Sequence, residues 1–267
     1  MKVRLERLLL FIFLCSGFMI EQTNASPLQK ESPSYRYVES EEAFITTESL
    51  VDILHITDED EYIIEWTGSS ETSDETDTQQ SITFLFDDGY LKDLSSGWSE
   101  ESDHVSITKQ TLSEDSSRYN AISFHFMTKT PAFSYDWSES MLYVFDTPMT
   151  ELHSFKKPKS KEEEKSQQVL DTIIKQQQNH IRRIIKDKAS LKSDVKLFPL
   201  YDTTAWKSLE KSPAFPHTHV EEIWSDIYQK LMEERKELQA DNKKGMPFIS
   251  WNKNSRQLSL YIHYGHV

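Results

Sequence analysis

Cysteine and glycine are both scarce in this chain of 267 residues. The single cysteine is Cys15, inside a leader that we expect to be removed. The remaining chain then has no thiol for disulfides, redox chemistry, nucleophilic catalysis or metal binding. Only six residues are glycine. Phosphate-binding loops concentrate several glycines within a few positions, so nucleotide binding of that kind is excluded.

The local motifs of common catalysts are missing as well. The sequence has no Gly-x-Ser-x-Gly elbow, no glycine-rich phosphate loop and no His-Glu-x-x-His zinc helix. No local signature indicates a Ser-His-Asp triad, but the residues of a triad can be far apart in the sequence, so this alternative stays open. We expect a protein that is not an enzyme.

The first 25 residues have the pattern of a secretory signal peptide. Basic residues occupy three of the first seven positions, and residues 8–20 are a mostly apolar run. Thr23 and Ala25 place small residues at the −3 and −1 positions of a cleavage site after Ala25. The run is shorter than the roughly 18 residues of a spanning helix. The sequence therefore predicts export, to the exterior or to the cell surface.

Two alternatives to cleavage stay open. An uncleaved leader would anchor the protein in the membrane, and we expect no other membrane-spanning segment. A lipid on Cys15 would require a small residue before the cysteine, whereas Leu14 is bulky, so lipidation is the less favoured alternative.

Charge is distributed unevenly along the chain. Residues 26–155 contain 6 Lys and Arg against 27 Asp and Glu, a balance of −21, whereas residues 156–267 contain 21 against 15, a balance of +6. The two halves should attract each other or face different partners. Nucleic-acid binding needs dense Lys and Arg on one face, so an acidic chain of this kind argues against it.

The acidic half has the alternation typical of an antiparallel meander. The stretch 68–80 is almost wholly polar and is predicted to be a loop, and Asp87-Asp88-Gly89 is a tight-turn signal. A short helix over 48–55 is an alternative to a strand at 51–56. Strands are predicted at 51–56, 62–67, 81–86, 105–109, 119–127 and 141–145, with an acidic turn at 57–61.

The basic half has the pattern of two long helices. Ser160 and Glu163 form a capping box before an apolar stripe that continues to about residue 188. Thr218 and Glu221 form a second capping box, before a helix that should fray near residue 242. A short helix is predicted at 205–209, and a terminal hairpin at 248–251 and 258–264.

These elements predict an α+β fold: an antiparallel β-sheet covered by two long amphipathic helices, with the C-terminal β-hairpin rejoining the sheet. The expected organisation is a signal peptide (1–25), an extended leader (26–42) and a single domain (43–267), with an acidic β-rich half (43–155) and a basic helical half (156–267).

Four histidines near the carboxyl end are a candidate metal site. His217 and His219 precede the second long helix, and His263 and His266 lie in the last strand and tail. If the hairpin packs beside that helix start, their imidazoles could converge on zinc. His-x-His alone specifies a metal site weakly, so no cofactor is expected and zinc is the alternative.

Phe133, Tyr135 and Trp137 are a candidate ligand site. They alternate with polar neighbours after Pro131, which predicts an exposed aromatic edge able to bind sugar or peptide.

Taken together, the sequence predicts an exported, non-enzymatic binding or regulatory accessory protein of the cell envelope, with another protein as its partner. The alternatives are a secreted hydrolase with a histidine metal site, and a sugar- or peptide-binding module.

Overall fold

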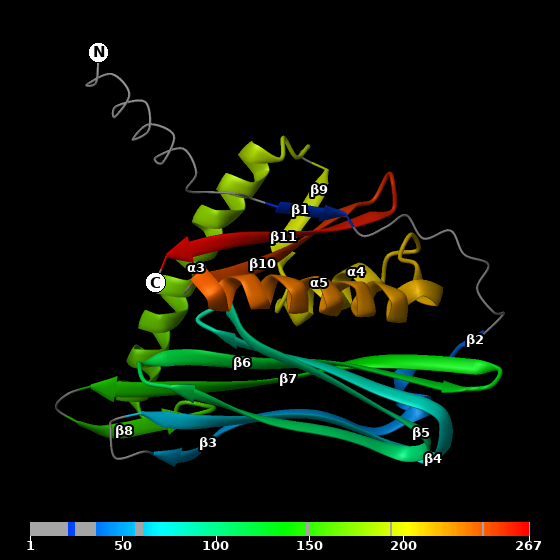
Figure 1. The fold of residues 1–267 in the computed structure, drawn as a ribbon, viewed down its shortest axis with the longest axis horizontal. Coiled ribbons are helices and arrows are strands. Elements are labelled where there is room, and N and C mark those ends of the chain that lie inside the picture. Colours follow the sequence, from blue (N-terminus) through cyan, green and yellow to red (C-terminus); the bar gives the residue numbers. More distant parts are fainter. Residues whose placement is uncertain are drawn as a thin grey trace.

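The protein is built mainly from β-strands (Figure 1). The structure is a computed structural model that describes residues 21–24, 36–56, 61–147, 150–192, 194–241 and 243–266. Strands account for 57% of the residues and helices for 28%, and the sheet is mixed. The expected fold, an antiparallel sheet covered by two long helices, is therefore wrong. The predicted cleavage site after Ala25 lies outside the described residues.

The described elements follow the chain in this order. The strands are β1 (Glu21–Asn24), β2 (Arg36–Tyr37), β3 (Phe44–Ile56), β4 (Tyr62–Asp87), β5 (Tyr90–Ser113), β6 (Ser117–Lys129), β7 (Ala132–Thr147), β8 (Thr150–Phe155), β9 (Val195–Pro199), β10 (Lys243–Asn252) and β11 (Gln257–His266). The helices are α2 (Ser40–Ala43), α3 (Lys161–Lys188), α4 (Thr203–Glu210), the 3-10 turn η1 (His217–His219) and α5 (Val220–Asp241).

The strands form one sheet in the order β1-β11-β10-β5-β4-β6-β7-β2, with β3 added to β4, β8 to β7 and β9 to β10. The short β2 runs parallel to β7, whereas β4, β5, β6 and β7 pair antiparallel. The predicted C-terminal hairpin is present as β10 and β11. It meets the main sheet through the pairing of Gly245 with Leu91.

The β4–β5 hairpin is unusually long and folds back on itself. Pairing runs from Tyr62 and Ser113 at the base to Asp87 and Tyr90 at the tip. The register shifts between Glu71 and Thr76, which marks the bend of the hairpin (Figure 1). Residues 68–80, predicted to be a loop, are therefore strand.

Two glycines let the halves of each bent strand approach closely. A Cβ atom on Gly68 would lie 2.0 Å from Thr83 Oγ1, and one on Gly97 would lie 2.8 Å from Ile107 Cγ1. Both distances are shorter than any real Cβ contact, so neither site accepts a side chain without displacement. The fold-back thus creates two layers. One layer consists of β3 and the base of the β4–β5 hairpin, and it lies over a second layer of β6, β7 and the tip of the same hairpin.

The space between the two layers is apolar at one end and polar at the other. The apolar end contains a core around Val51, Ile64, Trp66 and Leu85. The polar end explains why the loop prediction failed: serines and threonines of β4 face a buried polar interior instead of solvent.

His125 is the central residue of that polar interior. It is fully buried, its Nδ1 lies 2.9 Å from the Ser81 hydroxyl and its Nε2 lies 2.7 Å from the Ser138 hydroxyl. Ser49 of β3 continues the network to Ser138 and Ser123, at 2.8 and 2.7 Å. Burial lowers the pKa of His125 to about 3. The imidazole is therefore neutral at physiological pH.

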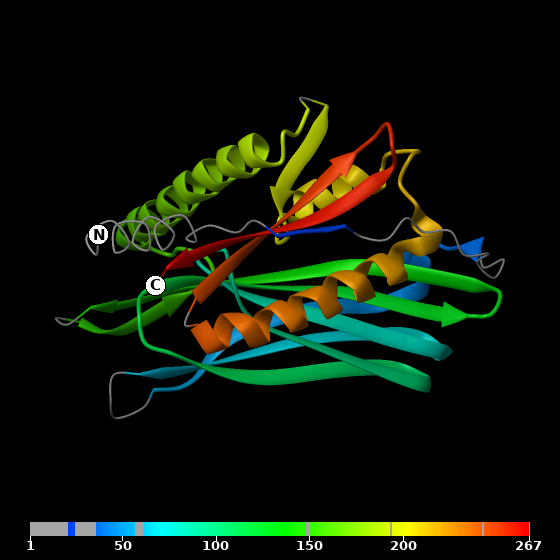
Figure 2. The same ribbon diagram turned by 45° about the horizontal axis from the view of Figure 1, so that its top comes forward.

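The long helices pack on both sides of the β10–β11 hairpin (Figure 2). Helix α5 lies between that hairpin and the main sheet, where Trp224 stacks on Phe124 with ring centroids 5.3 Å apart. Helix α3 covers the opposite face of the hairpin with Ile181 and Ile185. No helix among the described residues is long and apolar enough to cross a membrane.

Both helix starts were predicted at nearly the right place. The Ser160 hydroxyl accepts a hydrogen bond from the Glu163 amide at 3.2 Å, as the capping box requires. Helix α5 begins at Val220, after the 3-10 turn that contains Thr218.

The polar interior should make stability depend on pH. Protonation of His125 is disfavoured only in the folded state, so the free energy of unfolding should fall as pH drops below 6.5. At about 1.4 kcal/mol per pH unit, this group removes about 2 kcal/mol between pH 6.5 and 5. Urea denaturation at pH 7 and 5 should show this loss in the native protein and a correspondingly smaller loss in His125→Gln. If His125→Gln lost as much unfolding free energy between pH 7 and 5 as the native protein and the exposed control His55→Gln, then His125 would not be the group responsible.

The close approach at the fold-back can be tested at Gly68. Gly68→Ala should destabilise the protein by about 1–3 kcal/mol, because the new methyl group overlaps the Thr83 hydroxyl. Gly265→Ala is the matched control, since its Cβ would sit at an ordinary 3.5 Å from Tyr90. Thermal unfolding compares the two variants; equal melting temperatures would mean that the layers are not in close contact at Gly68.

Candidate functional site

A polar cavity lies where the tip of the β4–β5 hairpin returns over its base. Its volume is about 710 Å³. The tip contributes Asp87, Asp88 and residues 90–93, the base and the β5–β6 loop contribute Glu61 and residues 111–117, and Tyr119 of β6 completes this wall. Arg235 of α5 and Lys244 of β10 close the other side. The cavity therefore exists because the hairpin is bent double.

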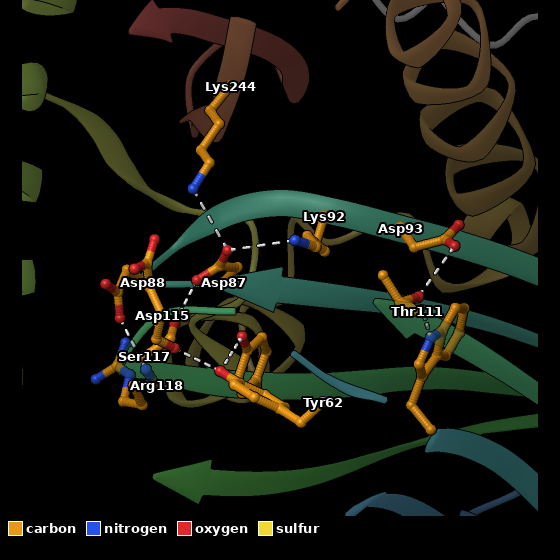
Figure 3. A network of polar contacts seen from close by, with 12 residues as sticks. Tyr62, Asp87, Asp88, Lys92, Asp93, Thr111, Asp115, Ser117, Arg118 and Lys244 are labelled. Atoms are coloured by element: carbon orange, nitrogen blue, oxygen red, sulfur yellow. Dashed lines mark hydrogen bonds and ion pairs between the residues drawn. The ribbon is translucent and has the colours of Figure 1, made fainter. Parts of the chain in front are cut away.

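Hydrogen bonds connect the base and the tip of the hairpin to the β5–β6 loop and β6 at the cavity wall (Figure 3). The Tyr62 hydroxyl donates to the carbonyl oxygen of Asp115 at 2.5 Å and lies 2.8 Å from the Tyr119 hydroxyl. The Ser117 hydroxyl donates to the carboxylate of Asp87. Burial raises the pKa of both tyrosines, so they remain protonated and able to donate.

The turn at the tip holds an acid in a desolvated position. Asp88 and Gly89 have φ angles of 50° and 88°, as the Asp-Gly signal predicted. The Asp88 carboxylate accepts the Arg118 amide at 2.8 Å. Burial, together with the neighbouring charge of Asp87, raises the pKa of Asp88. A positive charge nearby would stabilise its ionised form.

Acidic side chains outnumber basic ones along the cavity. Arg235 pairs with Asp93 at 2.8 Å, while Lys244 and Lys92 approach Asp87 at 3.5 and 3.9 Å. The lining contains six acids and three bases, a formal excess of three negative charges: Glu61, Asp87, Asp88, Asp93, Glu114 and Asp115 against Lys92, Arg235 and Lys244.

One lining hydroxyl has unused hydrogen-bonding capacity. Ser113 is buried, and its Oγ has no hydrogen-bond partner among the described residues. Buried polar atoms of this kind are rare in folded proteins. A ligand or water molecule in the cavity would satisfy it.

The predicted aromatic edge is not exposed. Phe133, Tyr135 and Trp137 lie on β7 and are each at most 5% exposed, within the main core. The Trp137 indole donates to Glu210 at 2.5 Å. Ligand binding by these three residues stays a prediction that this burial does not favour.

The four histidines occupy different surroundings. His217 contacts Tyr135, His219 lies 3.3 Å from Glu222, and His263 is buried on β11 near Lys188 of α3. The side chain of His266 lies outside the described residues. Within the described part of the chain, no three metal-ligating side chains gather. The zinc alternative stays a prediction.

The structure does bring together residues predicted for two different sites. The Tyr135 hydroxyl lies 2.6 Å from His217 Nδ1, and the Tyr37 ring packs against both, with centroids 5.3 Å from each. Burial lowers the pKa of His217 and raises that of Glu210 to about 7. These contacts link β2, β7, α4 and η1.

The residues of the polar cavity were not recognised as a site from the sequence. Asp87, Asp88 and Gly89 were read correctly as a turn, but nothing in the local pattern places that turn beside Asp115 or Arg235. The available signal was the concentration of acids in residues 26–155.

Comparisons with known proteins give little. No family model and no curated protein matches this chain. A solved structure of Bacteroides uniformis β-glucuronidase 2, covalently bound to cyclophellitol-6-carboxylate aziridine, is similar over 41% of this chain and 15% of that chain. The sequence identity is 12% and the TM-score is 0.27. A TM-score this low supports no statement about fold or function here.

The raised pKa of Glu210 predicts an opposite pH effect to that of His125. The folded state favours the protonated carboxyl, so stability should fall as pH rises from 4.5 through about 7. Glu210→Gln mimics the protonated form and should be more stable than the native protein by about 2–3 kcal/mol at pH 8. Urea denaturation at pH 5 and 8 measures this, with exposed Glu100→Gln as the control. A Glu210→Gln protein that loses as much stability as the native one over this range would refute it.

Proposed function

We propose that this protein is an exported, non-enzymatic binding protein whose recognition site is the polar cavity, and that its partner presents a positively charged group there. The observation that carries the proposal is the cavity itself: about 710 Å³, with six acids against three bases on its wall. Export is the expectation from the leader sequence.

The size and charge of the cavity support binding. Small-molecule and side-chain sites commonly have volumes of about 300–1,000 Å³. A surface with excess negative charge favours cationic ligands and speeds their association. The desolvated Asp88 gains most from such a ligand, because a cation offsets both its burial and the neighbouring Asp87.

The composition of the wall supports binding more than catalysis. Serines 113, 116 and 117 line the cavity, but the described lining residues include no histidine or cysteine. A serine hydroxyl needs an adjacent base to become a nucleophile. The wall consists of strand ends and one turn, which suits recognition of a charged group.

The test uses two probes that differ only in charge. N-acetyl-arginine amide should bind with a measurable heat in isothermal titration calorimetry, and its neutral isostere N-acetyl-citrulline amide should bind at least about tenfold more weakly. Asp88→Asn should weaken arginine-probe binding about tenfold. Asparagine tolerates the left-handed backbone at this position and keeps an acceptor oxygen for Arg118.

The control is Asp74→Asn, at the bend of the hairpin, where Asp74 is exposed and pairs with Lys129 at 3.0 Å. It should leave binding unchanged. Equal binding of both probes, or no binding of either, would refute a cation-binding cavity.

A further inference from the structure

We propose that the positively charged group is a lysine or arginine side chain of an extended partner polypeptide, and that a neighbouring apolar residue of that polypeptide packs on a row of apolar side chains beside the cavity. This inference rests on the proposed function. It adds the class of ligand and the second contact surface.

The apolar row crosses three adjacent strands of the outer layer. Ile63 of β4 is paired with His55 of β3 on one side and with Leu112 of β5 on the other. Ile53 and Ile64 form the preceding pair and face the core between the layers. Alternation along the strands therefore turns Ile63 outward.

Leu54 joins this row because of an irregularity in β3. The register shifts between Ile53 and His55, so Leu54 is an extra residue beside the pair of His55 and Ile63. Leu54 is 50% exposed and Leu112 is 51% exposed. Adjacent strands are about 4.8 Å apart, so the row of Leu54, Ile63 and Leu112 spans about 10 Å.

The row and the cavity are continuous. Leu112 belongs to the row and also lines the cavity, next to the buried Ser113 hydroxyl that has no hydrogen-bond partner among the described residues. The acids Glu114 and Asp115 follow directly in the same wall. The part of a bound ligand that extends out of the cavity past Leu112 would therefore contact exposed apolar surface.

An extended polypeptide fits this combination better than a free amine. A free amine would use the acidic wall and leave the row exposed. In an extended chain, side chains at positions i and i+2 lie on the same face about 7 Å apart, so one polypeptide can place one side chain in the cavity and the other on the adjoining row. Charge complementarity assigns the basic residue to the cavity, and the row accepts its apolar neighbour.

Three blocked probes separate the two contacts. The probes are N-acetyl-arginine amide, acetyl-Ser-Ser-Arg-Ser-Ser-amide and acetyl-Leu-Ser-Arg-Ser-Leu-amide, in which each leucine is two positions from the arginine; affinities are measured by isothermal titration calorimetry. The leucine peptide should bind about tenfold more tightly than the serine peptide, because burying one leucine against the row removes apolar surface from water.

The matched variants are Leu112→Ser and Leu50→Ser. Both leucines are partly exposed on the outer layer, but Leu50 pairs with Thr67, four residues along β4 from Ile63. Leu112→Ser should abolish the advantage of the leucine peptide and leave the serine peptide within about twofold. Leu50→Ser should change neither affinity. Because Leu112 is half exposed, its substitution should leave the fold intact, as circular dichroism would show.

The possible outcomes are distinguishable. If all three probes bind with equal affinity, or if Leu112→Ser and Leu50→Ser have the same effect, the polypeptide inference is wrong while the cation-binding cavity stands. If no probe binds, the proposed function fails and the inference fails with it.

Discussion

The structure depends on one constraint, the close stacking of the two halves of the β4–β5 hairpin. A straight hairpin of this length would leave its tip and base far apart. The bend at residues 71–76 and the missing side chains at Gly68 and Gly97 let the halves meet. Stacking then buries the His125 network and places the Asp87–Tyr90 tip over Tyr62 and Ser113. The polar cavity is a direct consequence, because its two walls are the two ends of the same hairpin.

Local signals in the sequence predicted local structure well. The Asp-Gly turn, the Ser160 capping box and the C-terminal hairpin all occur where their patterns indicated. The fold class was wrong because the stretch 68–80 is polar, and polarity was taken as exposure. In the structure Thr76 and Gln79 are buried among other polar side chains, so a hydrophobicity pattern could not reveal that strand. The packing of α5 between two β layers also has no local signal.

The residues of the candidate site show the same limit, because local sequence patterns do not indicate which distant segments pack together. Asp88 and Asp115 are 27 positions apart and become parts of one wall only after the hairpin bends. The split of charge along the sequence was informative, since Arg235 and Lys244 from the basic half reach Asp93 and Asp87 from the acidic half. These ion pairs join the two halves at the cavity, and the surplus of acids over bases there is the basis of the proposal that the cavity binds a cation. The histidine and aromatic candidates followed type and spacing alone, which do not determine burial.

The most direct test of this account is the number of protons released when N-acetyl-arginine amide binds, measured calorimetrically at pH 4.5 in two buffers with different ionisation heats. Burial raises the pKa of Asp88 and so favours its protonated form, whereas a cation in the cavity should favour loss of that proton. We predict a binding heat that depends on the buffer, with net proton release that is smaller in Asp88→Asn than in the native protein. A binding heat independent of the buffer, or proton release unchanged in the variant, would contradict the account.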